Sequence, residues 1–419
     1  MITSAFSITA TERILPKLAF DFTTATLDSR ITFSRLLNTA TRVNNFGYIE
    51  TVTQNTPRFD YDPNSLSCKG LLIEESRQNL VVSSTDMTNT TYWTGGSNYG
   101  LVGNQPDLSN GTAAVNISDT AASSTHLFQG ATFNCVTGNT YTVSAYFKKG
   151  TATVVQLFFS SIVAPTTTYA NFDINNGIVG TVGSTATATI QTIGNGWYRC
   201  TMTGTANQTN PNRFFVALTN NNTTAGRVPS YAGSGQYFTM CNPQVELGAF
   251  ATSYIPNVGN VQNTRNADDA IITGANFTSW WTAGGGAMSA IATPYVTTGI
   301  RTIVQFDNNS ANNIIAIRGN AVDPEFYIVN GGIPQVQIDT GTITAATLYK
   351  VAAAWDTNNC AAAKDGANIS TSTTAIIPSP NQARIGSDGT TYLNGWVQSI
   401  LYWPQRITNA QVQAFSKQS

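Results

Sequence analysis

The chain has 419 residues with a formal net charge of −1, and hydrophobic residues make up 41% of it, enough for sizeable cores. Charged residues make up only 10%, against about 25% in ordinary soluble domains, and Thr, Asn, Ser and Gly replace them. No basic stretch is present that would bind nucleic-acid phosphates, and no apolar run approaches the roughly 18 residues that span a membrane. The first residues lack the basic start and clean apolar core of a signal peptide.

The cysteines and the single histidine argue against several kinds of site. The five cysteines are far apart, odd in number and without a C-x-x-C pair, which predicts free thiols rather than disulfides or a zinc site. His126 is the only histidine, so a multi-histidine metal site is excluded and a Ser-His-Asp triad would have to use it. Because His126 lies in a polar segment that leads into a predicted strand, we expect no catalytic role for it. We also expect no cofactor.

Residues 1–88 form the first predicted block. Charged residues cluster here, and Asn, Pro and Gly break the block into short segments. The segments 31–35, 47–52 and 70–76 are typical of short strands, and no amphipathic helix is evident. We therefore predict loops and strands held together by ion pairs and side-chain hydrogen bonds.

Residues 89–256 show a series of strands separated by turn signals, which predicts a β-sandwich. In residues 140–150, apolar side chains alternate with polar ones, so one face of that strand should be buried. Asn176-Gly177 predicts a hairpin with a type I′ turn. The other predicted strands are 154–160, 168–182, 196–204, 213–219 and 235–247.

A polar linker around Pro256 precedes a second strand series at residues 265–419, which predicts another sandwich. A hairpin is expected around Asn330-Gly331, and residues 347–356 and 395–405 alternate as strands do. The only good helix signal is 407–415, where Thr408 is the predicted N-cap and Gln411 completes a capping box. The fold class is therefore all-β, with two sandwiches after a block of loops and short strands.

The order of these segments resembles that of bacteriophage virion proteins of the head-fibre, tail-fibre and spike type. Residues 18–84 carry the most specific match. Residues 89–256 resemble a jelly roll of the carbohydrate-binding-module type, and residues 265–419 resemble a concanavalin A/laminin-G sandwich. The matching segments are 33–35, 40–42, 57–63, 70–75 and 77–80, followed by FDINNG, GNGWYRC, QVELGAFATSYIP, LYKVAAAWD, ARIGSD and YLNGWVQSILYWPQRITNAQVQAF.

The resemblance implies a protein of the virion surface, made in the host cytoplasm without a signal peptide. Residues 1–88 would attach it to other virion proteins of the capsid or tail, and the sandwiches would bind host-surface glycans. Fibre-like relatives imply a homo-oligomer, with a trimer as the expected form. No interaction with nucleic acid and no membrane insertion are expected.

The stretch PRFDYDP, residues 57–63, places two aspartates two positions apart. On a strand, Asp60 and Asp62 would share one face, so a cation could bind there. No oxygen-rich spacing of a calcium loop follows, so the favoured interpretation is scaffold, with Arg58 pairing with nearby charges and the aspartates capping backbone N–H groups.

Five aromatic residues are the candidates for glycan binding, because sugar rings stack on aromatic faces and strand alternation explains these five least. Packing in a core or interface is nevertheless the favoured interpretation for each. The candidates are Tyr92, Trp93, Tyr99, Trp280 and Trp281.

We expect no enzymatic activity, because residues 265–419 show no strand with the paired carboxylates that a glycan depolymerase requires. The acidic residues there are interpreted as turn residues. Two alternatives to an adhesin stay open: a decoration or cement protein that binds no sugar, and a glycan depolymerase.

Overall fold

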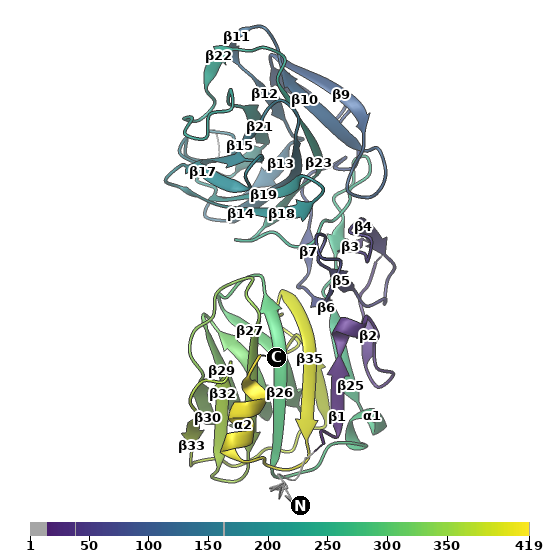
Figure 1. Ribbon diagram of the computed structural model, residues 1–419, viewed down its shortest axis with the longest axis vertical. Helices are drawn as coiled ribbons and strands as arrows, with labels where there is room; N and C mark the ends of the chain where they lie inside the picture. The colour runs from purple at the N-terminus through teal and green to yellow at the C-terminus, as the bar shows by residue number, and fades with distance from the viewer. Residues whose placement is uncertain (1–14, 38, 162–163, 419) are drawn as a thin grey trace, which may run out of the picture. The chain divides into compact units, whose positions relative to one another are not determined.

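The computed structural model describes residues 15–37, 39–161 and 164–418, and its regular secondary structure is almost entirely β-strand (Figure 1). The chain divides into two compact units. Unit 1 consists of the described residues up to Phe33, residues 70–73 and residues from Asp269 onward, and unit 2 consists of residues 34–69 and 74–268. The described part of residues 1–88 therefore contributes to both units. The prediction of an all-β chain with β-sandwiches is confirmed.

Unit 1 is built from two antiparallel sheets. One has the strand order β33-β32-β31-β26-β35-β6, with β1 also paired to β35, and the other has the order β2-β25-β34-β27-β28-β29-β30. The elements are β1 (Leu18–Asp21), η1 (Phe22–Thr24), β2 (Thr32–Ser34), β6 (Cys68–Ile73), β25 (Asp269–Thr273), α1 (Ala275–Thr278), β26 (Gly286–Pro294), β27 (Ile300–Asp307), β28 (Ile314–Asn320), β29 (Asp323–Asn330), β30 (Ile333–Asp339), β31 (Tyr349–Trp355), β32 (Cys360–Lys364), β33 (Ser370–Ser372), β34 (Gln382–Ile385), β35 (Gly395–Trp403) and α2 (Asn409–Ser416).

Aromatic side chains fill the core of unit 1. Phe306 and Phe326 come from one sheet, and Trp355 and Tyr402 come from the other. The ring centroids of Phe326 and Trp355 are 5.9 Å apart, and those of Phe306 and Tyr402 are 5.7 Å apart. Large rings at these separations bury much apolar surface and favour the close approach of the two sheets.

Helix α2 covers the outer face of one sheet. Thr408 is its N-cap and Gln411 completes the capping box, as predicted. Ile407 and Val412 pack in one buried cluster with alanines of β31 and β32, whose short side chains let the helix lie close. Within the described part of the chain, no helix has the length and apolar character needed to cross a membrane.

Unit 2 contains a sandwich of two further sheets, with the orders β18-β19-β14-β23-β10-β9 and β17-β16-β15-β21-β12-β8, and four shorter strand pairs. The strands are β3 (Ala40–Val43), β4 (Ile49–Val52), β5 (Phe59–Tyr61), β7 (Arg77–Gln78), β8 (Gly95–Ser97), β9 (Tyr99–Gln105), β10 (Ala114–Asp119), β11 (Ser123–Thr125), β12 (Leu127–Gln129), β13 (Phe133–Cys135), β14 (Thr140–Lys149), β15 (Val154–Phe159), β16 (Tyr169–Asp173), β17 (Ile178–Val182), β18 (Ala186–Gly194), β19 (Trp197–Thr205), β20 (Asn210–Asn212), β21 (Phe214–Leu218), β22 (Ser230–Ala232), β23 (Tyr237–Leu247) and β24 (Thr264–Arg265).

Both faces of the central strand β14 are buried. Tyr141, Val143 and Phe147 point into the main core, which confirms the predicted alternation. The opposite face is also covered, because Tyr146 packs in a second cluster with Ile49 of the segment 34–69. That segment therefore packs on the outer side of the sandwich and belongs to the same unit.

Two turn predictions need correction. A hairpin does join β16 and β17, but only Gly177 has positive φ, at 69°, so the turn is not type I′. Asp173 shapes this turn, since its side chain accepts hydrogen bonds from the backbone N–H groups of Asn175 and Asn176. The next predicted hairpin turns one residue later than expected, at Gly331-Gly332, where both φ values are positive.

Candidate functional site

A pocket of about 380 Å³ lies in unit 2, within the size range of roughly 300–1,000 Å³ that is usual for ligand sites. Its lining is mainly hydroxyl and amide side chains, with a single tyrosine and a single arginine. The lining residues are Val82, Thr91, Tyr92, Thr94, Ala131, Thr132, Arg213, Asn260 and Gln262.

A buried tryptophan positions the tyrosine of the pocket. The backbone N–H groups of Tyr92 and Trp93 donate to the carbonyl oxygen of Asn89, at 3.1 and 3.0 Å. Trp93 stacks on Phe128 with ring centroids 5.2 Å apart, and its Nε1 donates to the carbonyl oxygen of Ser83 at 3.0 Å. The turn is therefore anchored at Trp93. Half-buried Tyr92 lines the pocket, and its hydroxyl makes no hydrogen bond with the described residues.

Hydrogen bonds fix a second wall of the pocket. Gln262 Nε2 donates to the carbonyl oxygen of Leu80 at 2.6 Å. Buried Asn257 uses its Nδ2 to donate to the carbonyl oxygens of Asn79 and Val81, at 2.8 and 2.7 Å. These contacts hold residues 257–262 against residues 79–82. A wall built in this way needs little reordering when a ligand binds, which favours affinity.

Arg213 lies on the third side of the pocket, immediately before β21. The next residue, Phe214, is fully buried in the main core, and its carbonyl oxygen accepts a hydrogen bond from Gly130 at 3.0 Å. A side chain at Gly130 would place its Cβ 2.6 Å from the Phe214 ring, so glycine is needed for this approach. The Arg213 backbone is held by Ser160, whose N–H donates to the Arg213 carbonyl oxygen at 3.1 Å.

The structure separates the five predicted aromatic residues. Trp93 is only 3% exposed and Trp280 only 1%, so the favoured interpretation of core packing holds for both, and neither is kept as a candidate for sugar binding. Trp281 stacks against Phe277 and the aromatic core of unit 1. Tyr99 lies in β9 and packs its ring edge against the core, leaving Tyr92 as the candidate that lines the pocket.

The two aspartates of PRFDYDP serve different backbone groups. Asp60 Oδ1 accepts a hydrogen bond from the N–H of Val43 at 2.7 Å. Asp62 Oδ1 accepts from the N–H groups of Asn64 and Ser65, at 2.9 and 2.8 Å, and so closes a turn. This geometry is that of the predicted scaffold. Among the described residues, no group of three or more His, Cys, Asp or Glu side chains is placed to hold a metal ion.

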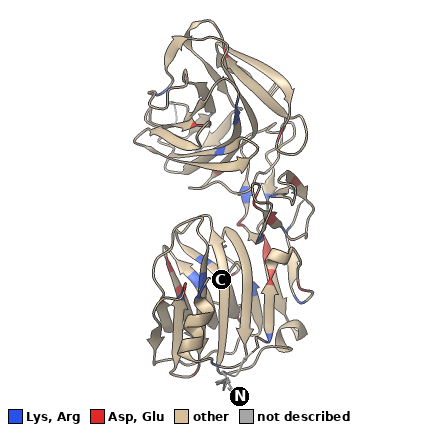
Figure 2. Ribbon diagram, viewed as in Figure 1, with Lys and Arg blue, Asp and Glu red and all other residues tan. Residues whose placement is uncertain are grey.

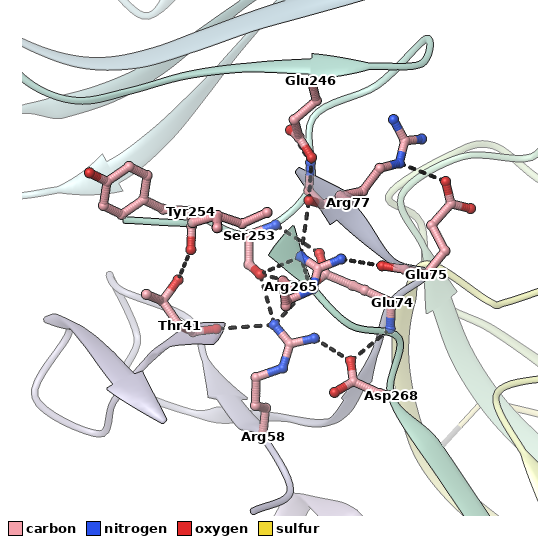
Figure 3. Close-up of polar contacts among 12 residues, drawn as sticks. Thr41, Arg58, Glu74, Glu75, Arg77, Glu246, Ser253, Tyr254, Arg265 and Asp268 are labelled. Carbon is pink, nitrogen blue, oxygen red and sulfur yellow. Dashed lines mark hydrogen bonds and ion pairs between the residues drawn. The ribbon is translucent and has the colours of Figure 1, made fainter. Parts of the chain in front are cut away.

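Arg58 belongs to a buried network of charges in unit 2 (Figure 3). Its guanidinium pairs with Glu74 at 2.7 Å and with Asp268, and Asp268 also pairs with Arg35 at 2.9 Å. Arg265 pairs with Glu74 at 2.9 Å. These side chains are completely shielded from solvent. Charged residues gather around this part of the chain, among β3 to β7 (Figure 2).

Neutral groups complete the network. Ser253 donates to both carboxylate oxygens of Glu74, through its N–H at 2.8 Å and its hydroxyl at 2.7 Å. Arg58 also donates to the carbonyl oxygen of Thr41 at 3.1 Å, and the Thr41 hydroxyl donates to the carbonyl oxygen of Tyr254 at 2.6 Å. Segments near residues 41, 58, 74 and 253–268 are thus joined at one point.

The network shifts the pKa values of Glu74 and Arg58. Burial alone would raise the pKa of Glu74, but the charges of Arg265 and Arg58 and the hydrogen bonds from Ser253 lower that pKa to about 2. Burial opposes the charge of Arg58, yet the carboxylates of Asp268 and Glu74 raise its pKa above the usual value. Glu74 and Arg58 therefore stay ionised at neutral pH, which suits a structural junction and not acid–base chemistry.

Sequence patterns missed several features. Arg213, Asn260 and Thr132 were not predicted as site residues, although Arg213 stands out as a cation in a region poor in charge.

His126 is fully buried, with Nδ1 2.7 Å from the carbonyl oxygen of Asn98 and Nε2 3.2 Å from that of Tyr231. Both ring nitrogens thus contact backbone groups.

Two acidic residues of residues 265–419 do not lie in the predicted turns. Asp307 ends strand β27 and Glu325 lies within β29, so they are not turn residues. Asp307 accepts from Gln305 Nε2 at 2.9 Å, and Glu325 pairs with Arg318 at 2.7 Å.

No family model matches the chain, and no curated protein matches its sequence. The chain is similar to the solved CBM40 module of the Ruminococcus gnavus IT-sialidase bound to α2,3 sialyllactose, with 10% identity and a TM-score of 0.30 over 34% of this chain and 87% of that one. It is similar to a botulinum neurotoxin type C structure whose title reports interaction with two ganglioside molecules, with 14% identity and a TM-score of 0.29 over 36% and 39% of the chains. A SAP-like pentraxin from Limulus polyphemus matches with 15% identity and a TM-score of 0.25 over 33% and 73%. Because the identities and TM-scores are this low, the ligands and activities of these proteins are not assigned to this chain.

Proposed function

We propose that this chain is a glycan-binding protein of a bacteriophage virion surface, without enzymatic activity. The pocket of unit 2 carries this proposal. Tyr92 offers a ring and a hydroxyl beside the hydroxyl and amide groups of Thr132 and Asn260. None of these three side chains makes a hydrogen bond with the described residues. A partly aromatic, hydrogen-bonding pocket of this kind suits a sugar ring and its hydroxyl groups.

The virion location rests on the resemblance of residues 18–84 to head-fibre, tail-fibre and spike proteins. In this proposal the chain is anchored to other virion proteins and forms a homo-oligomer. Many copies on one particle would bind a polysaccharide through multiple weak sites, and the effective concentration would strengthen attachment. Light scattering of the full-length protein tests the oligomer. Labelling purified particles with an antibody against the chain tests the location.

The first test of the proposal is binding of the full-length protein to surface polysaccharides of candidate hosts. We expect saturable binding that Tyr92→Ala weakens about tenfold, as loss of one aromatic contact with its hydroxyl would do. Tyr237→Ala is the matched control, because Tyr237 is an exposed tyrosine of the same unit that does not line the pocket. Equal loss in both variants, or no binding to any host polysaccharide, would contradict the proposal.

The same samples test the absence of catalysis. Incubation with a bound polysaccharide should release no reducing ends, and the polymer should keep its length on gel filtration. Release of defined oligosaccharides would make the chain a depolymerase instead.

A further inference from the structure

Arg213 is the one charged residue among the described residues that line the pocket. Its guanidinium makes no hydrogen bond and no ion pair with any residue that the structure describes. Every other described arginine is engaged by a carboxylate, a carbonyl oxygen or a polar side chain. These arginines are Arg30, Arg35, Arg42, Arg58, Arg77, Arg199, Arg227, Arg265, Arg301, Arg318, Arg384 and Arg406.

The fold accounts for the position of Arg213 but not for its charge. Phe214 is buried against Trp93, with ring centroids 6.1 Å apart, and strand alternation then places Arg213 on the side away from that core. Only its backbone is bonded: its N–H donates to Asn212 Oδ1 at 2.7 Å, and its carbonyl oxygen accepts from the N–H of Ser160 at 3.1 Å. A neutral side chain at residue 213 would satisfy the same packing. The unpaired guanidinium therefore has no structural role that the described contacts show.

An arginine in this setting recognises an anion. The guanidinium is planar, stays charged and presents a fork of N–H donors that matches a carboxylate in a bidentate arrangement. The pocket supplies no acid of its own to compete, since its other lining residues are neutral. Tyr92 and Asn260 lie in the same pocket and can reach neighbouring hydroxyl groups of the ligand.

We propose that the pocket binds a sugar residue that carries a carboxylate, with Arg213 pairing with that carboxylate while Tyr92 contacts the ring. This inference rests on the proposed glycan-binding function and names the class of sugar. A uronic acid and a nonulosonic acid share the required chemistry. The two classes of sugar place their other hydroxyl groups differently. The pocket should prefer the class whose hydroxyl groups lie within hydrogen-bonding reach of Tyr92, Asn260 and Thr132.

The test uses the full-length protein and two acidic probes, tetragalacturonate and sialyllactose, each compared with its carboxyl methyl ester. The ester keeps the sugar and removes the negative charge. Isothermal titration should show binding of at least one acid, and about 10- to 100-fold weaker binding of its ester, as loss of a charge-assisted hydrogen bond predicts. Comparing the two acids shows which class of acidic sugar the pocket accepts.

Substitutions at residue 213 assign the effect to this residue. Arg213→Gln should weaken binding of the acid by the same factor and leave binding of the ester unchanged, and Arg213→Lys should restore part of the loss. Lys148→Gln is the matched control, because Lys148 is an exposed cation of the same unit outside the pocket. Unchanged thermal unfolding of the variants would show that the fold is intact.

The outcomes separate this inference from the proposed function. Equal binding of acid and ester that Tyr92→Ala weakens and Arg213→Gln does not would keep a glycan-binding pocket and overturn the acidic-sugar assignment. If Arg213→Gln and Lys148→Gln weaken binding of the acid equally, general attraction between the protein and a negative charge explains the binding. That result would also overturn the acidic-sugar assignment. If neither these probes nor the host polysaccharides bind, both proposals fail.

Discussion

Replacing Glu74 by Gln tests whether the buried charge network stabilises unit 2. The pKa of Glu74 falls from an ordinary value of 4.5 to about 2 in the folded protein. A difference of this size at about 1.4 kcal/mol per pKa unit corresponds to about 3 kcal/mol at pH 7. A similar loss, of roughly 3–5 kcal/mol, is usual when one partner of a buried ion pair is removed. We therefore expect Glu74→Gln to lower the free energy of unfolding by about 3 kcal/mol at pH 7.

The dependence on pH distinguishes this explanation from simple packing damage. Because the folded pKa of Glu74 is below its unfolded value, its stabilisation is complete above about pH 4.5 and is lost as the pH falls towards 2. The difference between wild type and Glu74→Gln should shrink to about 1 kcal/mol at pH 3. Denaturant unfolding at pH 7, 4.5 and 3 measures it.

Glu50→Gln is the control for this experiment. Glu50 pairs with Arg42 in the same unit, but both side chains are partly exposed, so the loss should stay below about 1 kcal/mol at every pH. A difference for Glu74→Gln that remains constant between pH 7 and pH 3, or that equals the difference for Glu50→Gln, would refute the electrostatic role of the network.

Three further predictions concern stability and reactivity. Trp93→Ala should destabilise unit 2 by roughly 3–5 kcal/mol, since Trp93 is buried against Phe128, and Trp280→Ala should do the same in unit 1, both measured by denaturant unfolding. Burial raises the pKa of Cys360 to about 11 and also raises the pKa values of Cys135, Cys200 and Cys241, so iodoacetamide at pH 8 should alkylate Cys68 first, as mass spectrometry would show. Thr408→Ala should cost about 1 kcal/mol in unit 1, because it removes the N-cap of α2; no change in the thermal transition would count against that role.

Local patterns were enough to predict the class of fold. Period-two alternation in β14 predicts which side chains enter the main core, and the Thr408–Gln411 capping box predicts where α2 begins. These features depend on neighbours within a few residues, so the sequence alone reveals them. The type of turn at Asn176-Gly177 was harder to predict. Its conformation depends on the Asp173 side chain, which lies outside the Asn-Gly pair and accepts hydrogen bonds from the turn backbone.

The charge network could not be predicted from the sequence, because its members are far apart along the chain. PRFDYDP suggested that Arg58 pairs with nearby charges, but its partner Asp268 lies 210 residues away. Glu74 and Ser253 are 179 residues apart. No local pattern indicates such pairs, because they form only when the linker folds back onto the segment 34–69. The motif residues on which the phage resemblance rests include Arg35, Arg58 and Glu74 of this network.

The candidate site, like the charge network, is formed by residues that are distant in the sequence. The sequence identified Tyr92 and Trp93 together, as aromatic residues in a polar, glycine-rich stretch, and by itself established an all-β chain that is poor in charge and has no basic stretch. Only the tertiary structure decided that Trp93 enters the core while Tyr92 lines a pocket with Arg213 and Asn260. Adjacent residues point in different directions, and the walls of a pocket come from segments more than a hundred residues apart, so both depend on how the sheets and linker pack.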